Sequence, residues 1–139
     1  MKTLVFAAVA GFAFALHAPA SPACGYCVED KIASVYDHAV MKKAQGSNHH
    51  VVFFHIDGTF VSDSATRRMV EASAGPVEGV DRGTVRVSLE TASLSLAFDP
   101  HRTSLAAVQR TVDRRLASKK LSLFLLRVDQ PAELKTAIR

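Results

Sequence analysis

Residues 51–70, VVFFHIDGTFVSDSATRRMV, decide the fold of this chain, because they hold one complete strand-to-helix unit. The run 51–56 is rich in β-branched and aromatic side chains, which predicts a buried strand that an Asp-Gly pair then ends. Ser62 and Asp63 follow, and their side chains are suited to accept hydrogen bonds from the free N–H groups of a helix. We expect this helix to bury a face made of Ala65, Met69 and Ala72.

The chain after this unit repeats the alternation of strands and helices. Apolar and polar residues alternate over 84–89 and again over 94–98, so the two segments predict an antiparallel hairpin. Ser104 is a suitable cap for a second helix. The apolar face of that helix is Leu105, Val108, Val112 and Leu116, and a last, mostly apolar strand covers 121–128. The order is βαββαβ, which predicts an α+β, ferredoxin-like antiparallel sheet with two helices on one face.

A family resemblance appears in the second half of this segment. Gly79-Val80, the alternating Val85, Val87 and Leu89, and the run LSLAFDPHRTSLAAVQRTV at 94–112 resemble the heavy-metal-associated domain of copper chaperones, mercury-binding periplasmic proteins and metal-pumping ATPases. The resemblance covers about 51–128 and implies the ferredoxin-like fold, but the family's metal site does not carry over to the matching loop. In that family the loop after the first strand carries Gly-Met-Thr-Cys-x-x-Cys. Here the matching segment runs from Gly58 to Ser64, and Val61 and Ser64 replace the two cysteines.

The first 23 residues have the pattern of a secretory signal peptide. Lys2 precedes the apolar run LVFAAVAGFAFAL, and small residues follow it. We expect cleavage after Ala20 or Ala23, and an exported, periplasmic or secreted protein with no membrane span in its mature form. Removal of this segment takes one lysine from a chain of 17 basic and 13 acidic residues. The small positive excess predicts a solvated face rather than a nucleic-acid surface.

An N-terminal arm, residues 24–46, separates the signal peptide from the first strand. Its only cysteines are Cys24 and Cys27, and a helix is expected from Val28 to Lys43, with Ile32 among its buried residues. The positive end of a helix dipole and its free N–H groups stabilise a thiolate, so Cys24 is expected to have a lowered pKa. Three interpretations of the pair remain open. They are a soft-metal site, a thiol-disulfide redox site, and a short disulfide or idle thiol pair without further function.

Histidines are the candidate ligands that would complete a cysteine site. Two thiolates with one or two imidazoles make a tetrahedral metal site, although no His-x-His or His-x-x-x-His spacing unites the histidines here. The candidate metal ligands are Cys24, Cys27, His38, His49, His50 and His55. Cu(I) is the preferred ion, and Hg(II) or Zn(II) are the alternatives.

The face of the predicted sheet opposite the two helices carries apolar side chains that we expect to be buried by another segment. If Phe54 points to the two helices, then Phe53 points to the opposite face, where Phe124 and Leu126 join it, while Leu125 points inward. We expect the helix from Val28 to Lys43 to lie across this apolar patch, within one chain or exchanged in a homodimer. The alternative is that the patch receives another protein.

The sequence therefore predicts a protein that is not an enzyme and that binds or delivers a soft metal ion. No nucleophile elbow or phosphate loop is present, and Asp57, Asp63 and Asp99 occupy turn or cap positions. A metal-transport protein or another periplasmic protein is the expected partner. The alternative functions are a metal-free interaction module and a thiol-disulfide oxidoreductase. Residues 129–139 are expected to form a short C-terminal tail.

Overall fold

The computed structural model describes residues 27–131. They form a four-stranded antiparallel sheet with the order β2-β3-β1-β4. The strands are β1 (His50–Asp57), β2 (Arg86–Ser88), β3 (Ser93–Phe98) and β4 (Ser122–Asp129). The helices are α1 (Val28–Val35), α2 (His38–Gly46), α3 (Ser64–Ala74) and α4 (Leu105–Leu116), and the short 3₁₀-helix η1 (Ala117–Lys119) follows α4. From β1 onward the order is βαββαβ, so the predicted α+β ferredoxin-like fold is confirmed.

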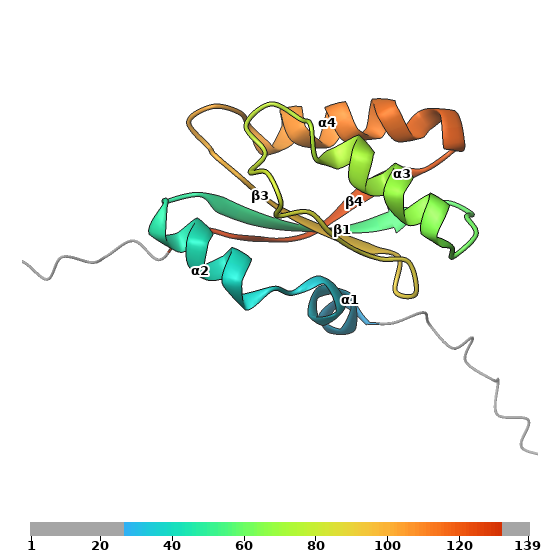
Figure 1. Cartoon of the computed structure of the whole chain (residues 1–139), viewed down its shortest axis with the longest axis horizontal. Coiled ribbons are helices and arrows are strands. Elements are labelled where there is room, and N and C mark those ends of the chain that lie inside the picture. The colour runs from blue at the N-terminus through green and yellow to red at the C-terminus, as the bar shows by residue number, and fades with distance from the viewer. Residues whose placement is uncertain (1–26, 132–139) are drawn as a thin grey trace, which may run out of the picture.

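Helices cover both faces of the sheet. α3 and α4 pack on one face, and α1 and α2 lie against the other (Figure 1). Under α3 and α4 the main core contains Val52, Phe54 and Ile56 from β1, all at most 1% exposed. The second core contains Phe53 and Ala97 from the sheet and Ile32, Val35, Val40, Met41 and Ala44 from α1 and α2. The alternation of side chains along β1 therefore assigns neighbouring residues to two separate cores.

The expected cover of the open face is present within a single chain, but it is two helices rather than one. α1 ends at Val35, because Tyr36 and Asp37 have extended backbones. The Asp37 carboxylate then accepts hydrogen bonds from the backbone N–H groups of Ala39 and Val40 and starts α2. The prediction of one continuous helix over 28–43 was therefore wrong.

The caps of the two central helices are as predicted, but the buried face of α3 is not. Asp63 accepts a hydrogen bond from Thr66 N at 2.7 Å, and Ser104 accepts one from Ala107 N at 3.1 Å. α3 buries Val70, Ser73 and Ala74, whereas Ala65 and Ala72 are exposed and Met69 is half-buried. The hydroxyl of Ser73 donates to Met69 O, which satisfies it inside the helix layer.

β4 contains a β-bulge that the sequence did not predict. Phe53 pairs with Arg127 and Phe54 pairs with Leu125, so Leu126 is an extra residue between the two pairs. Leu125 faces the α3/α4 side but is 47% exposed, because it lies at the uncovered edge of the sheet. Leu126 packs against the second core, as expected.

No helix within the described part of the chain is long and apolar enough to cross a membrane. The predicted signal peptide, Cys24 and most of the predicted C-terminal tail lie outside the described residues.

Candidate metal site

Cys27 is the residue at which the docked part of the chain begins. It is the N-cap of α1, its backbone oxygen accepts from Lys31 N at 3.1 Å, and its side chain is exposed and not in a disulfide. The thiol donates a hydrogen bond to the carboxylate of Asp30, with Sγ and Oδ2 3.1 Å apart. Position Cys24, three residues earlier, lies outside the described residues. The sequence prediction that Cys27 precedes a helix is confirmed.

α1 is held on the sheet by polar contacts as well as by its apolar side chains. Lys31 donates to Thr91 O at 3.1 Å, and the hydroxyls of Ser34 and Thr91 are 2.6 Å apart. The hydroxyl of Ser95, in β3, donates to Val35 O at 2.7 Å. These contacts run along the helix and fix it against β3 and the β2–β3 turn. Cys27 is therefore presented from the N-cap of a docked helix.

His49 and His50 stand together at the start of β1 and are held by other groups. His49 Nδ1 lies 2.7 Å from Asp81 Oδ2, and its Nε2 lies 3.8 Å from Asp99 Oδ2. The ring of His50 meets the ring of Phe98 edge to face, with the centroids 5.5 Å apart. Neither residue is next to a cysteine among the described contacts.

His38 and His55 occupy different places. His38 is the exposed first residue of α2. His55 lies near the far end of β1 and is half-buried, with Nδ1 2.9 Å from Ala92 O and 3.0 Å from the Lys31 ammonium nitrogen. The two contacts need different states of the ring. A protonated Nδ1 donates to the carbonyl, whereas an unprotonated Nδ1 accepts from the lysine, so the two hydrogen bonds cannot form at the same time.

The predicted ligands are therefore not gathered into one cluster. Within residues 27–131 no group of three or more His, Cys, Asp or Glu side chains is arranged to hold a metal ion. The sequence interpretation did not select Asp30 or Lys31. The contact between Asp30 and Cys27 could have been expected from the sequence, because residues three apart on a helix lie on one face. Lys31 reaches His55 only through the docking of α1, and no local pattern could reveal that contact.

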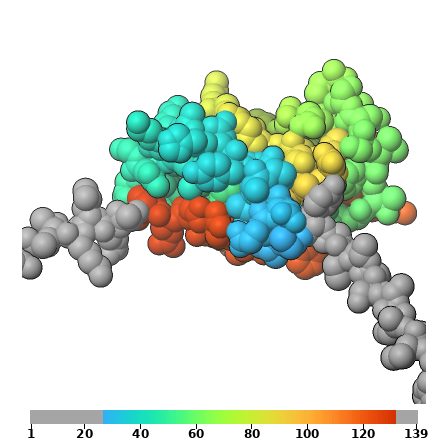
Figure 2. Space-filling model, turned by 90° about the horizontal axis from the view of Figure 1, so that it is seen from below, coloured from blue at the N-terminus to red at the C-terminus, as the bar shows by residue number. Residues whose placement is uncertain are grey.

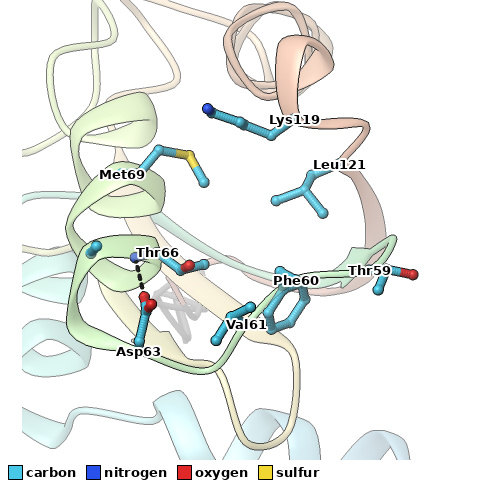
Figure 3. Close-up of a pocket in the computed structure, with 9 residues that line it drawn as sticks. Thr59, Phe60, Val61, Asp63, Thr66, Met69, Lys119 and Leu121 are labelled. Carbon is cyan, nitrogen blue, oxygen red and sulfur yellow. Dashed lines mark hydrogen bonds between the residues drawn. The ribbon is translucent and has the colours of Figure 1, made fainter.

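The loop that resembles the family's metal loop lines a groove of about 410 Å³, together with α3 and the segment 119–121. Gly58 begins this loop with φ 121°, and a Cβ there would lie 2.6 Å from the backbone oxygen of Lys120, so the turn requires glycine. Figure 3 shows Phe60, Met69 and Leu121 around the groove and the Lys119 ammonium at its margin. Among the described residues that line the groove, Met69 alone carries sulfur, as a thioether.

The fold defines the class of this protein as a ferredoxin-like α+β domain with an added N-terminal helix layer. Two solved structures are similar to it in fold. One is a copper binding domain from HMA7, a P-type ATPase, with 18% identity and a TM-score of 0.48, covering 58% of this chain and 97% of that chain. The other is oxidized MerP from Ralstonia metallidurans CH34, with 23% identity and a TM-score of 0.44, covering 55% of this chain and 96% of that chain. No protein-family model and no curated protein matches the sequence.

Proposed function

We propose that this chain is an exported, non-enzymatic protein that binds or delivers a soft metal ion through Cys24 and Cys27. The observation that carries the proposal is the exposed, unpaired thiol of Cys27 at the N-cap of α1, three residues after a second cysteine. Thiolates are the ligands that soft ions prefer, and the first turn of a helix offers free N–H groups to an anionic sulfur.

The arrangement of the histidines narrows the choice of ion. A tetrahedral Zn(II) site needs four ligands, and the histidines that would complete it are spread over both ends of β1 and the start of α2. A pair of thiolates alone suits Cu(I) or Hg(II), both of which are soft. We therefore assign the ion to this soft class, with Cu(I) preferred.

Asp30 places a carboxylate beside the proposed ligand Cys27. Its carboxylate accepts the Cys27 S–H bond at 3.1 Å, and this bond is lost when the thiol is deprotonated. Metal binding by thiols releases their protons, so the apparent affinity rises with pH. Replacing Asp30 by Asn removes a negative charge beside the sulfur, and we expect the Asn variant to bind the ion more tightly at a given pH.

An anaerobic Cu(I) competition titration against a chromophoric chelator tests the proposal. The reduced chain from residue 21 to 139 is compared with its Cys24→Ser/Cys27→Ser variant, and a His38→Asn/His50→Asn variant serves as the matched control. Tight binding of one ion should vanish in the cysteine variant and persist in the histidine variant. Equal, weak binding by all three proteins would contradict the proposal for copper. The same titration with Hg(II) would then test whether the cysteine pair binds any soft metal ion.

A metal-free interaction module is the second candidate function. The observation that favours it is the exposure of two large apolar side chains, Phe124 and Leu125, at one edge of the sheet. A binding module of this kind would be unaffected by removal of both cysteines, which separates it from the metal-binding proposal.

A further inference from the structure

The side of α3 and α4 that faces away from the sheet carries a group of arginines. On α4, Arg110 and Arg114 lie one turn apart, opposite the buried Val108. On α3, Arg68 lies opposite the buried Val70. All three arginines are exposed, and within residues 27–131 none of them forms an ion pair. We call these three residues the basic face.

The carboxylates of the same two helices point elsewhere. Asp113 is half-buried on the flank of α4, where it accepts a hydrogen bond from Leu123 N at 2.7 Å. Glu71 is half-buried on the flank of α3 and lines a cleft with Arg67 and Arg86. These are the two acidic residues of α3 and α4, so neither of them neutralises the basic face.

The two helix layers differ in charge. Residues 64–74 and 105–120 contain seven basic and two acidic residues, and Arg115, Lys119 and Lys120 are exposed members of this set beside the basic face. Residues 28–46, which form the layer on the other side of the sheet, contain three basic and three acidic residues. Like charges one turn apart, as at Arg110 and Arg114, slightly destabilise a helix. The stability of α4 therefore does not explain this arrangement.

The shape of the basic face suits small anionic groups. A hollow of about 320 Å³ is lined by Ala107, Arg110, Thr111 and Arg114. Two guanidinium groups and a hydroxyl are donors that match the oxygens of a phosphate group. Exposed alanines, Ala72 on α3 and Ala106 on α4, leave the charged side chains as the groups that project furthest.

The composition of this face favours lipid over protein as its partner. A stable protein interface has a core of large apolar or aromatic side chains. Among the described residues, the large apolar side chains that are exposed all lie outside α3 and α4. Clusters of Lys and Arg on a helix bind an anionic membrane surface through charge alone, without such a core.

We propose that the basic face binds the surface of a membrane that contains anionic phospholipids. The protein would lie on the membrane without insertion, with headgroup phosphates near Arg110 and Arg114. α1 and α2 lie on the opposite side of the sheet (Figure 1), and Figure 2 shows them covering the side of the molecule that faces the viewer. Attachment through α4 would therefore leave Cys27, at the start of α1, directed toward solvent. The proposal goes beyond metal binding and does not depend on it.

Cosedimentation with lipid vesicles tests the proposal. The protein is the chain from residue 21 to 139, which lacks the apolar segment of the predicted signal peptide, with Cys24→Ser and Cys27→Ser. These two substitutions remove the proposed metal ligands, so a failure of the metal proposal has no influence on the result. Vesicles of phosphatidylcholine with about one third phosphatidylglycerol are compared with vesicles of phosphatidylcholine alone. Binding should require phosphatidylglycerol and should weaken steeply as salt is added.

Two double variants with the same loss of charge are compared. Each basic residue near an anionic surface contributes about fivefold in affinity, so Arg110→Gln/Arg114→Gln should bind about thirtyfold more weakly. Lys42→Gln/Lys43→Gln is the matched control, because both lysines are exposed on α2, on the far side of the sheet. The control should lose at most about threefold, because its lysines lie beyond the reach of a screened surface charge. Circular dichroism checks that both variants are folded.

A selective loss of binding to phosphatidylglycerol vesicles in the arginine variant would support the proposal. Equal losses in the two variants would overturn it, because net charge and not this face would then cause the binding. Failure of the parent protein to bind either kind of vesicle would also overturn it. So would binding of a poly-glutamate peptide but not of vesicles, which would indicate an acidic protein as the partner. Release from vesicles by millimolar inorganic phosphate at constant ionic strength would overturn it too, because the hollow would then bind a free anion.

Discussion

Phe53 and Phe54 are neighbours in β1 and are equally buried, yet they belong to two different parts of the molecule. Phe54 packs under α3 and α4, which belong to the βαββαβ domain itself. Phe53 packs under α1 and α2, which come from the chain before the first strand. A ferredoxin-like domain with both helices on one face leaves its other face bare, and here the chain closes that face with its own N-terminal arm.

The two layers also differ in the interactions that hold them. The core under α3 and α4 draws apolar side chains from all four strands and both helices. The core under α1 and α2 is smaller, and polar contacts such as Ser95 to Val35 O supplement it. A layer with fewer apolar contacts opens at a lower free energy than the rest of the structure. We infer that α1 and α2 form a separable unit on a more stable domain.

Substitution of the two phenylalanines tests this difference most strongly. Phe54→Ala should lower the free energy of unfolding by about 3–5 kcal/mol, because it leaves a cavity between the sheet and two helices that are fixed by many other contacts. Phe53→Ala should cost less, at the lower end of this range or about 3 kcal/mol, because the α1 and α2 layer is freer to collapse onto the space. Urea denaturation followed by circular dichroism measures both values. Equal losses would show that the two layers are one cooperative core.

Truncation of Ile32 addresses the α1 and α2 layer alone. Ile32 is 4% exposed in the second core, and Ile32→Ala should cost that layer about 2 kcal/mol. Hydrogen exchange should accelerate in α1 and α2 and remain unchanged in α3 and α4. Val70→Ala, in α3, is the matched control and should accelerate exchange throughout the domain. Uniform acceleration in both variants would contradict a separable layer.

Removal of the Ser95 hydroxyl should also destabilise the α1 and α2 layer, but by less than truncation of Ile32. Ser95→Ala deletes the donor to Val35 O and leaves that carbonyl buried without this partner, at a cost of about 1 kcal/mol. The expected result is faster amide exchange at the end of α1. Ser104→Ala, which removes the cap of α4, provides a comparison in the other layer, and its effect should appear in α4 instead. A change in α4 exchange on Ser95→Ala would mean that the layers are coupled.

Low pH should destabilise each helix layer by protonating the aspartate that caps one of its helices, Asp37 in α2 and Asp63 in α3. Hydrogen bonds from Val40 N–H and then from Arg86 lower the pKa of Asp37 below its ordinary value of 3.8. The hydrogen bond from Thr66 N–H lowers the pKa of Asp63 in the same direction. Stability from both carboxylates is therefore present above pH 3.8 and is lost as the pH falls through the lowered values.

The measurement is amide hydrogen exchange in each helix layer, compared between about pH 5 and about pH 2. Asp37→Asn should remove the acid response of α2, and Asp63→Asn should remove that of α3. An Asp37→Asn variant that retains the full response of α2 would contradict the assignment to this cap.

The parts of the fold that the sequence predicted depend on local signals. The antiparallel hairpin of β2 and β3, the Asp-Gly end of β1 and the caps Asp63 and Ser104 are all read from neighbouring residues, and the structure contains them. The errors have non-local causes. The buried side of α3 is set by how the helix lies on the sheet, so the alanines at 65 and 72 were a misleading guide.

The predictions for the candidate metal site also divide into those that depend on local sequence and those that depend on tertiary contacts. The position of Cys27 at the start of a helix follows from the local pattern and is confirmed. The separation of the histidines does not follow from it, because β1 carries His50 and His55 toward opposite ends and tertiary contacts engage His49 with Asp81. The contact between Lys31 and His55 needs the docked helix and has no signal in the sequence.

The bulge at Leu126 bears on how the length of this chain can vary in evolution. Leu125 pairs with Phe54 and Arg127 pairs with Phe53, so the two halves of β4 already have the register of a strand without the extra residue. Deletion of Leu126 would join them into a regular ladder and keep every other side chain on its present face, with Arg127 still over the Phe53 ring. A deletion in β1, which pairs with β3 without an extra residue, would instead turn the β1 residues on one side of it to the opposite face of the sheet. The last strand is thus the place in the sheet where one codon can be lost without a change of topology.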